Sequence, residues 1–155
     1  MSSTINRIFD FAYYQLENYN LSKSLVSKAS GSWEATSSKE FVEKMNIVSR
    51  GLLSLGVKPK DKIALISSTN RTEWNIMDMA LSQIGAINVP IYPTISKGDY
   101  KYIFNHAEVK LCFLSDKELF DKADAIKDEV KTLKGIYSFD KIEGCNHWEE
   151  LLPVI

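Results

Sequence analysis

The residues that come closest to a phosphate-binding pattern are Gly51, Gly56 and Lys58. The two glycines have the spacing of a phosphate loop, but a leucine-rich helix end separates them and no Lys-Ser or Lys-Thr pair follows. A second polar stretch, residues 67–70, follows an apolar block but holds no glycine that would let its backbone approach a pyrophosphate. We therefore expect close packing at Gly51, helix termination at Gly56 and helix capping by Asn70 rather than a nucleotide site.

Metal binding and nucleophilic catalysis would need histidine, cysteine, carboxylate or serine side chains in particular surroundings. His106 and His147 have no cysteine or acidic residue at ligand spacing, and no serine stands in a Gly-x-Ser-x-Gly motif. Asp116 ends an expected strand, as a phosphoacceptor aspartate would, but no acidic pair ends the first strand of the series. We therefore predict no catalytic, cofactor-binding or metal-ligating residue in this chain.

Length and composition describe an ordinary soluble domain. The chain has 155 residues, of which 45% are hydrophobic and 25% charged, and its formal net charge is -1. This composition excludes a disordered tail, a collagen-like fibre and a disulfide scaffold, and the charge offers no bulk attraction to nucleic acid or anionic lipid. A small basic run at residues 58–62 is divided by Asp61 and has no interleaved aromatic residue, so we expect no nucleic-acid partner.

Several features bear on the cellular compartment. Cys112 and Cys145 lie in different contexts, and we expect both to be reduced. The N-terminus lacks a basic flank followed by a continuous apolar stretch, and no apolar run approaches the roughly 18 residues of a membrane-spanning helix. These features predict a cytoplasmic protein without a transmembrane segment.

The elements that would position any site follow from the hydrophobic pattern. Apolar side chains at steps of three and four predict helices, and continuous apolar blocks predict strands buried on both faces. A turn at Ser30-Gly31 predicts a hairpin, and the capping-box spacing of Ser37 and Glu40 starts a helix. The expected helices span residues 4–18, 37–55, 70–84, 96–106 and 117–133, with a last turn near 148–152, and the expected strands span 24–29, 32–35, 62–67, 86–91, 109–114 and 136–139.

The alternation of strands and helices predicts the fold class. Strands separated by helices imply right-handed crossovers, so we expect an α/β fold with a mainly parallel sheet and helices on both faces. The blocks at 63–66, 86–91 and 109–114 should form neighbouring parallel strands, preceded in the chain by the N-terminal helix and the β-hairpin. No linker divides residues 1–155, so we expect a single unit. Its last residues, up to Ile155, are mostly apolar, and we therefore expect this unit to be a fragment of a larger fold.

Three segments carry a more specific signal. They read Ser-Ser-Thr-Asn-Arg-Thr-Glu-Trp at 67–74, Gly-Ala-Ile-Asn-Val-Pro-Ile-Tyr-Pro-Thr at 85–94, and Tyr-Ile-Phe-Asn-His at 102–106 before the block at 109–114. In order and spacing they resemble the N-terminal part of AMP-forming acyl-CoA synthetases, most of all long-chain fatty acid–CoA ligases, over roughly residues 4–152. Thr72 departs from the proline associated with its position, but either residue suits a first helical turn.

The resemblance implies a function for the intact enzyme rather than for this chain. Such ligases activate a carboxylate with Mg-ATP to an acyl-adenylate and pyrophosphate, and then transfer the acyl group to coenzyme A. Their phosphate loop and catalytic lysine belong to later sequence, so residues 1–155 are expected to be an inactive portion of the large N-terminal domain that holds no cofactor. ATP, Mg and CoA would serve the full-length enzyme, and residues 89–94 would form a wall of its cleft.

The sequence leaves two other readings open. One is an adenylate-forming ligase for another carboxylate, and the other is a non-catalytic binding or dimerisation module. The expected partners are the rest of the same polypeptide, a second copy and, in the intact enzyme, a fatty acid, with peripheral attachment to a membrane left open. Self-association is expected through the N-terminal helix or the Trp148 region. Acyl chain length, oligomeric state and the length of the parent protein do not follow from these residues.

Overall fold

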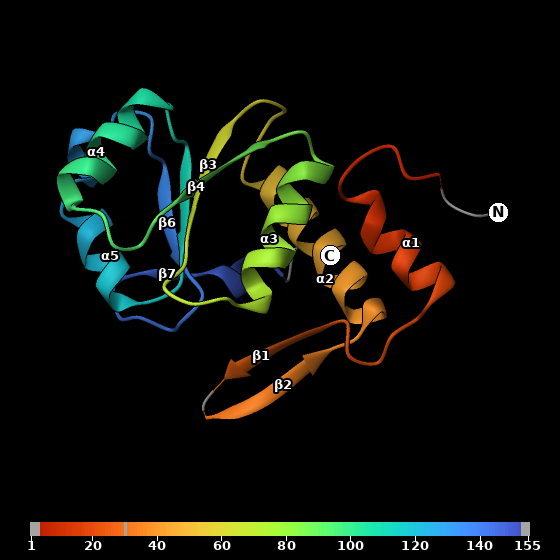
Figure 1. Ribbon diagram of the computed structural model, residues 1–155. Helices are drawn as coiled ribbons and strands as arrows, with labels where there is room; N and C mark the ends of the chain where they lie inside the picture. Colours follow the sequence, from red (N-terminus) through yellow and green to blue (C-terminus); the bar gives the residue numbers. More distant parts are fainter. Residues whose placement is uncertain (1–3, 30, 153–155) are drawn as a thin grey trace.

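The computed structural model describes residues 4–29 and 31–152, arranged as a sheet with helices on both faces and a projecting hairpin (Figure 1). The elements in chain order are α1 (Asp10–Asn18), β1 (Leu25–Ala29), β2 (Ser32–Thr36), α2 (Ser38–Ser54), β3 (Lys62–Ile66), α3 (Thr72–Gln83), β4 (Ile87–Ile91), α4 (Lys97–His106), β5 (Leu111–Leu114), α5 (Lys117–Asp124), the 3-10 turn η1 (Lys127–Glu129), β6 (Gly135–Ser138), β7 (Asn146–His147) and the 3-10 turn η2 (Trp148–Leu151).

The five-stranded sheet is entirely parallel and has the order β4-β3-β5-β6-β7. β3 has a partner on each side, so that Ile63 lies opposite Asn88 of β4 and Leu111 of β5. The chain leaves β3 through α3 to reach β4, and returns through α4 past β3 to β5 (Figure 1). The predicted α/β fold is thus confirmed, including the three apolar blocks as neighbouring parallel strands.

The core has two parts, one on each face of the sheet. Because side chains alternate along a strand, Ile63 and Leu65 of β3 belong to one hydrophobic cluster, whereas Ala64 and Ile66 belong to the other. α3 covers the first face, with α2 and then α1 stacked behind it, and α4 and α5 cover the second face (Figure 1). The prediction of helices on both faces is confirmed.

The hairpin and the helix after it form as expected. β1 and β2 pair antiparallel, with Val26 opposite Ala35, and they make a separate two-stranded sheet. At the start of α2, the Ser37 hydroxyl accepts a hydrogen bond from the Glu40 amide at 3.2 Å, and the Glu40 carboxylate accepts one from the Ser37 amide at 2.7 Å. This reciprocal pair satisfies two amides that a helix start leaves free.

The first predicted helix begins too early. α1 starts at Asp10 rather than near residue 4, because the Asp10 carboxylate accepts hydrogen bonds from the backbone amides of Asn6 at 3.1 Å and Arg7 at 2.9 Å. The Arg7 guanidinium also bonds the Asp10 carboxylate, at 3.0 Å. The residues before Asp10 are therefore held in a turn by the first acidic side chain of the helix.

The predicted helix over 117–133 is also wrong in its second half. α5 ends at Asp124, and a 3-10 turn follows before β6. Val130 is buried and Leu133 packs against the same cluster, so these two residues continue the apolar pattern without continuing the helix. The apolar spacing over residues 117–133 indicates which side chains are buried. A loop that packs on the core can bury side chains at this spacing just as a helix can.

Two strands differ from expectation at the ends of the sheet. β4 is an edge strand in which Ile87 and Pro90 are exposed and Ile91 is buried. A proline is tolerated there because an edge position does not require every backbone amide. β7 has two residues and was not predicted from the sequence, since a stretch so short has no periodicity. The last helical turn near Trp148 is confirmed as η2.

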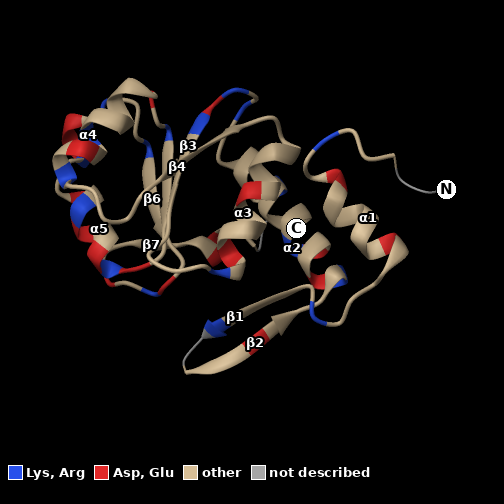
Figure 2. Cartoon of the chain, viewed as in Figure 1, with Lys and Arg blue, Asp and Glu red and all other residues tan. Residues whose placement is uncertain are grey.

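Acidic and basic residues alternate on the outer surfaces of α4 and α5 (Figure 2). The Lys117 Nζ atom lies 2.8 Å from Oδ2 of Asp121, and the Lys122 Nζ atom lies 3.5 Å from Oε1 of Glu118. Within residues 4–29 and 31–152, no helix combines the length and the apolar character that a bilayer crossing needs.

Candidate functional site

The topology of the sheet singles out one place for a site. α3 follows β3 on one face of the sheet, whereas α5 follows the neighbouring strand β5 on the other face. The loops after these two strands therefore diverge, and in open α/β sheets ligands bind in the crevice that such a divergence leaves at the carboxyl ends of the strands. The loops after β3, β5 and β6 meet at this edge.

Arg71 occupies this crevice. Its guanidinium donates to the Glu73 carboxylate at 2.7 Å, to the Asp140 carboxylate at 2.7 Å and to the backbone carbonyl of Ser115 at 3.3 Å. The same guanidinium lies over the ring of Phe139, 5.7 Å from the ring centroid. One side chain thus connects the loops that follow three adjacent strands, and the planar fork of arginine can serve several acceptors at once.

Charge in the crevice is balanced by the protein itself. Burial alone would lower the pKa of Arg71, but the hydrogen bonds and charges of Glu73 and Asp140 raise the pKa above its ordinary value. Burial raises the pKa of Asp116, whereas hydrogen bonds from Ser115 and Ser68 and from backbone amides lower it, and the net shift is downward. Both side chains are therefore ionised at neutral pH, and both are engaged in fixing loops.

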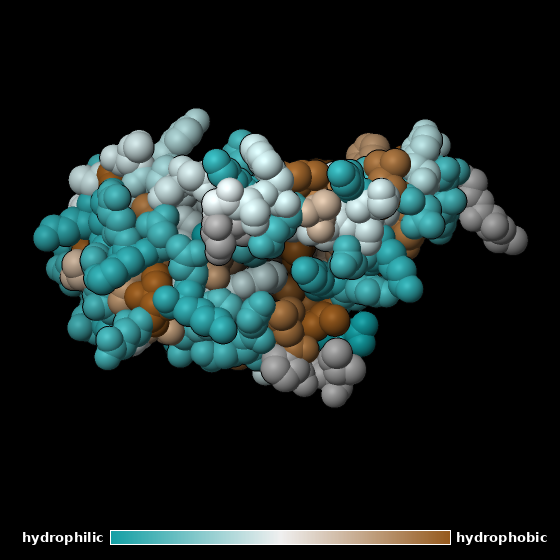
Figure 3. Space-filling model, turned by 90° about the horizontal axis from the view of Figure 1, so that it is seen from below, coloured by the Kyte–Doolittle hydropathy of each residue, from teal (hydrophilic) through white to brown (hydrophobic). Residues whose placement is uncertain are grey.

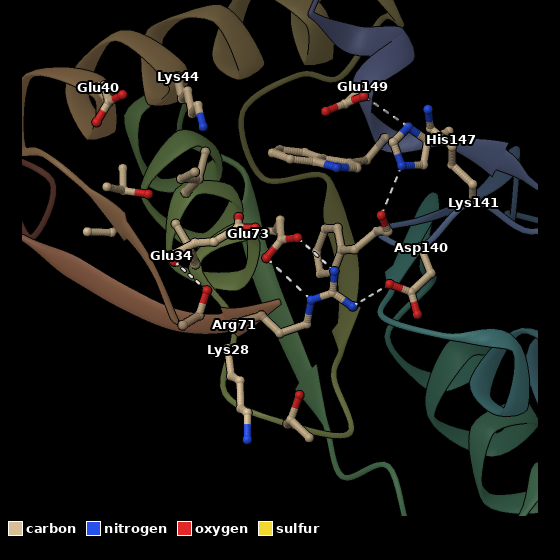
Figure 4. A pocket seen from close by; sticks show the side chains of 18 residues that line it. Lys28, Glu34, Glu40, Lys44, Arg71, Glu73, Asp140, Lys141, His147 and Glu149 are labelled. Carbon is tan, nitrogen blue, oxygen red and sulfur yellow. Dashed lines mark hydrogen bonds and ion pairs between the residues drawn. The ribbon is translucent and has the colours of Figure 1, made fainter. Parts of the chain in front are cut away.

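A groove of about 590 Å³ opens beside Arg71. The hairpin, the start of α2, the start of α3 and the loops around β6 and β7 form its walls (Figure 4). Its charged lining residues are Lys28, Lys44, Arg71, Lys141, Glu34, Glu40, Glu73, Asp140 and Glu149. Both signs are present in similar numbers, so the groove suits a chain or ligand that carries polar groups of both kinds rather than a strong anion.

Among the described residues that line the groove, the one histidine is His147, and both of its ring nitrogens have partners. The Nε2 atom of His147 lies 2.9 Å from the backbone carbonyl of Phe139, and its Nδ1 atom lies 3.6 Å from Glu149 (Figure 4). No serine or cysteine hydroxyl or thiol is bonded to this imidazole in the described part of the chain, and the described residues contain no group of three potential metal ligands. His147 therefore fixes the β6–β7 connection.

Comparison with known proteins places this architecture in a family. The family described as AMP-binding enzyme matches residues 15–152. This chain belongs to the AMP-binding enzyme family. Fatty acyl-CoA synthetase B of Dictyostelium discoideum is 35% identical over 113 residues, which make up 73% of this chain and 16% of that protein. The long-chain-fatty-acid–CoA ligase ACSBG2 of Xenopus laevis is 23% identical over 97% of this chain and 21% of that protein.

Solved structures of AMP-binding and related ligases share the fold. The anthranilate CoA ligase AuaEII superposes with a TM-score of 0.82 and 17% identity, over 95% of this chain and 28% of that one. A putative long-chain-fatty-acid CoA ligase of Rhodopseudomonas palustris gives a TM-score of 0.80 and 15% identity, over 95% of this chain and 36% of that one. The resemblance to acyl-CoA synthetases is confirmed, and this chain spans less than a quarter of the curated relatives named above.

Within this AMP-binding family member, the structure explains most residues that the sequence singled out. A Cβ atom on Gly51 would lie 2.5 Å from the carbonyl oxygen of Leu151, so the prediction of close packing is confirmed. Gly56 ends its helix with φ +80°, also as predicted. Asp61, which divides the basic run, pairs with Lys110 at 2.8 Å. His106 stacks on Tyr102 of its own helix.

The role predicted for Asn70 is wrong. The residue at the N-cap position of α3 is Arg71, whose backbone is extended, and no side chain caps this helix. The long arginine side chain turns instead toward Asp140 and Glu73. Asp116, by contrast, accepts the amide of Leu119 and so caps α5, which explains a carboxylate at the end of β5 without any phosphoacceptor role.

Sequence reasoning missed Arg71 and its partner Asp140, which lie 69 residues apart in the chain. One signal could have found them. Each directly follows or lies close behind a predicted parallel strand, and the carboxyl ends of parallel strands meet at one edge of a sheet. Opposite charges at two such positions predict a bridge between the loops.

Proposed function

We propose that this chain is part of a long-chain fatty acid–CoA ligase of the AMP-forming kind. In that reaction a fatty carboxylate attacks ATP to form acyl-adenylate and pyrophosphate, and the CoA thiol then displaces AMP and loses its proton. The observation that carries the proposal is the 35% identity with fatty acyl-CoA synthetase B, over 73% of this chain. ATP and Mg supply the activation of the carboxylate, and CoA supplies the accepting thiol.

The described residues do not fit a site for ATP. In the loop after β3, the Ser67 hydroxyl donates to the Thr69 carbonyl at 2.6 Å, and the Ser68 amide donates to the Ser115 hydroxyl at 3.0 Å. The guanidinium of Arg71 is already satisfied by carboxylates. Phosphoryl transfer needs free amides and cations preorganised around the phosphates, so we infer that those groups come from other parts of the ligase.

The role proposed for this chain is a scaffold that fixes one wall of the cleft. After β4, the carbonyl of Pro93 accepts hydrogen bonds from the Tyr100 hydroxyl at 3.2 Å and from Lys122 at 3.0 Å. α4 and α5 therefore both hold the segment 89–94, within which the side chain of Tyr92 is left exposed. A wall needs this kind of fixed backbone beside a side chain that is free to contact a ligand.

Similarity of fold does not identify which carboxylate is the substrate. Structures of an anthranilate ligase and of a putative fatty acid ligase superpose equally well, and at 15–17% identity they show the fold alone. The sequence relatives favour a fatty acid over an aryl or amino acid. We also propose a cytoplasmic location for the ligase.

Self-association is proposed for the N-terminal helix region only. Ile8, in the turn before α1, and Phe11, in the first turn of α1, are both exposed. The Trp148 region, which the sequence also suggested, does not offer an apolar surface, because Trp148 and Leu151 are buried against α2 and the core. The C-terminal apolar residues up to Leu152 thus belong to this chain's own packing, and Val154 and Ile155 lie outside the described residues.

Two measurements test the proposed function. Calorimetry of the 155-residue chain with Mg-ATP should show no micromolar binding, and the longer gene product should release pyrophosphate with a long-chain fatty acid. An aryl carboxylate and an amino acid are the matched substrates. If only the aryl carboxylate led to pyrophosphate release, the proposed substrate class would change from fatty acids to aryl acids. If no carboxylate led to pyrophosphate release, the ligase assignment would be overturned.

A further inference from the structure

The amino ends of the strands, at the edge of the sheet opposite the crevice, are basic. The segments that enter β3, β4, β5 and β6 span residues 56–62, 84–86, 107–110 and 130–134. They hold six of the 19 lysine and arginine residues of the chain but only two of its 20 acidic residues, Asp61 and Glu108. The six basic residues, which we call the amino-edge lysines, are Lys58, Lys60, Lys62, Lys110, Lys131 and Lys134.

The strand order places three of these lysines side by side. The backbone amide of Lys110 donates to the carbonyl of Lys62 at 2.9 Å, and the amide of Lys134 donates to the carbonyl of Lys110 at 2.7 Å. These three residues therefore form a row across β3, β5 and β6, with about 5 Å between neighbouring strands. The amide of Lys60 donates to the Gly85 carbonyl at 2.8 Å, which extends the row to the entry of β4. Figure 2 shows this edge at the top, with lysines at the upper ends of the strands.

Little of this positive charge is neutralised within the protein. Lys110 donates to the Asp61 carboxylate at 2.8 Å and to the Gly56 carbonyl at 2.7 Å. The hydrogen bond from Lys110 lowers the pKa of Asp61, so this carboxylate is ionised and cancels one lysine. The described residues hold no ion-pair partner for the other five amino-edge lysines, of which all but Lys62 are exposed. Like charges on neighbouring strands repel, so this row costs stability that a partner of opposite charge would recover.

The carboxyl edge of the sheet has no such excess. The segments that leave β3, β4, β5 and β6 span residues 67–71, 92–96, 115–116 and 139–145. Their charged residues are Arg71, Lys141, Asp116, Asp140 and Glu143. Figure 3 views the molecule from this side, and hydrophilic residues cover most of its left part. Both edges are thus polar, but only at the amino edge does one sign of charge dominate.

Exposed aliphatic side chains accompany the amino-edge lysines. Ile87, the first residue of β4, is 45% exposed and lies opposite Lys62 in the parallel register. Leu55, at the end of α2, is 41% exposed, and the hydrogen bond from Lys110 to Gly56 ties this end of α2 to the edge. Cations beside exposed aliphatic residues are typical of proteins that bind the surface of an anionic bilayer. Nucleic acid is a poorer match, because single strands stack on aromatic side chains and the four entering segments hold none.

We propose that the amino edge of the sheet is a docking surface for an anionic lipid bilayer, with the amino-edge lysines on the lipid headgroups and Ile87 and Leu55 adding apolar contact. The inference goes beyond the proposed function and does not depend on it. The net charge of the whole chain, -1, predicts no attraction to anionic lipid, but the amino edge differs from the average of the chain. Binding of this edge to a cytoplasmic leaflet, which carries anionic lipid, would leave the crevice at the carboxyl edge facing water.

Flotation with lipid vesicles tests the proposal on the 155-residue chain and on the longer gene product. Vesicles of phosphatidylcholine with about one-third phosphatidylserine should bind both proteins, and vesicles of pure phosphatidylcholine should bind neither. Raising the salt from about 0.1 M to about 0.5 M should release most of the bound protein, because the Debye length falls. No binding to the anionic vesicles, or equal binding to both kinds of vesicle, would overturn the proposal.

Two triple variants with the same net charge locate the surface. One replaces three exposed amino-edge lysines by glutamine: Lys58→Gln, Lys131→Gln and Lys134→Gln. The control replaces three exposed lysines outside the edge: Lys23→Gln, Lys39→Gln and Lys97→Gln. All six side chains are exposed, so both variants should keep the melting temperature of the parent. The edge variant should bind the anionic vesicles about 100-fold more weakly, at about fivefold per lysine, and the control less than about threefold more weakly. Equal weakening would show a response to net charge alone and overturn the proposal.

Further outcomes separate this inference from the alternatives and from the proposed function. Vesicle binding by the short chain alone would show that the longer product covers the edge, and would overturn the proposal. Tighter binding to a short DNA duplex than to the anionic vesicles would assign the edge to nucleic acid and overturn it as well. A longer product that releases pyrophosphate with fatty acids but binds no vesicles would refute the docking surface and leave the function standing. Vesicle binding without pyrophosphate release would support the docking surface and refute the function.

Discussion

α3 and α5 perform the same task on opposite faces of one sheet, and they are stabilised in different ways. α3 has no side-chain cap and no basic residue in its last turn, but it lies between the sheet and α2 (Figure 1). α5 has the Asp116 cap, Lys122 in its last turn and ion pairs on its outer surface. A helix packed on two sides depends on its surroundings, whereas a helix with one solvated side depends more on signals in its own sequence.

The largest expected effect concerns the packing of α3. Leu81→Ala should lower the free energy of unfolding by about 3 kcal/mol, because Leu81 is fully buried and a cavity would remain. Urea unfolding of the 155-residue chain measures this change. Leu53→Ala on the exposed side of α2 is the control and should cost less than about 1 kcal/mol. Similar losses from both would contradict the view that α3 is held by its surroundings.

A pair of glycines compares the two faces directly. Gly51→Ala should destabilise the chain by about 2 kcal/mol, because the new methyl group would meet the backbone of Leu151 at 2.5 Å. Gly98→Ala on α4 meets only a serine hydroxyl at 3.6 Å and should stabilise the chain by about 0.5 kcal/mol through helix propensity. Thermal melting should show a lower melting temperature for Gly51→Ala and a higher one for Gly98→Ala than for the parent chain. A neutral Gly51→Ala would show that η2 moves away at little cost.

The cap of α5 makes a pH-dependent contribution. The pKa of Asp116 is lowered in the folded chain, so its contribution to stability is complete above the ordinary aspartate value of 3.8 and is lost as the pH falls below it. Asp116→Ala should cost about 1 kcal/mol at neutral pH. Asp116→Asn keeps a capping oxygen without the charge, and should be less sensitive to acid than the parent chain in urea unfolding between pH 7 and pH 3. An unchanged acid dependence would rule out this carboxylate as its source.

The smallest effect is expected on the outer surface of α5. Lys117→Ala removes the 2.8 Å pair with Asp121, and both side chains are mostly exposed, so the loss should be about 0.3 kcal/mol. Salt should weaken the pair further, and the difference between variant and parent should vanish in about 1 M salt. A loss that persists at high salt would point to lost packing rather than lost charge.

Local signals in the sequence were sufficient for most elements of this protein. The capping box at Ser37, the dipeptide Ser30-Gly31 and the apolar block at 63–66 are each a signal of a few residues, and the helix, hairpin and strand that they predict are present. Ser30 itself lies outside the described residues. The resemblance in the segments 67–74, 85–94 and 102–106 was equally local, and it identified the family that the comparisons show.

Tertiary structure decided the features that depend on distant parts of the chain. The position of β4 at the edge, and hence the exposure of Ile87, follows from the crossovers and not from the composition of the strand. The bridge from Arg71 to Asp140 spans 69 residues, so its partners are brought together only by parallel strands that end at one edge. A sequence pattern records which side chains avoid water, but which groups face each other is fixed only when the strands have taken their order.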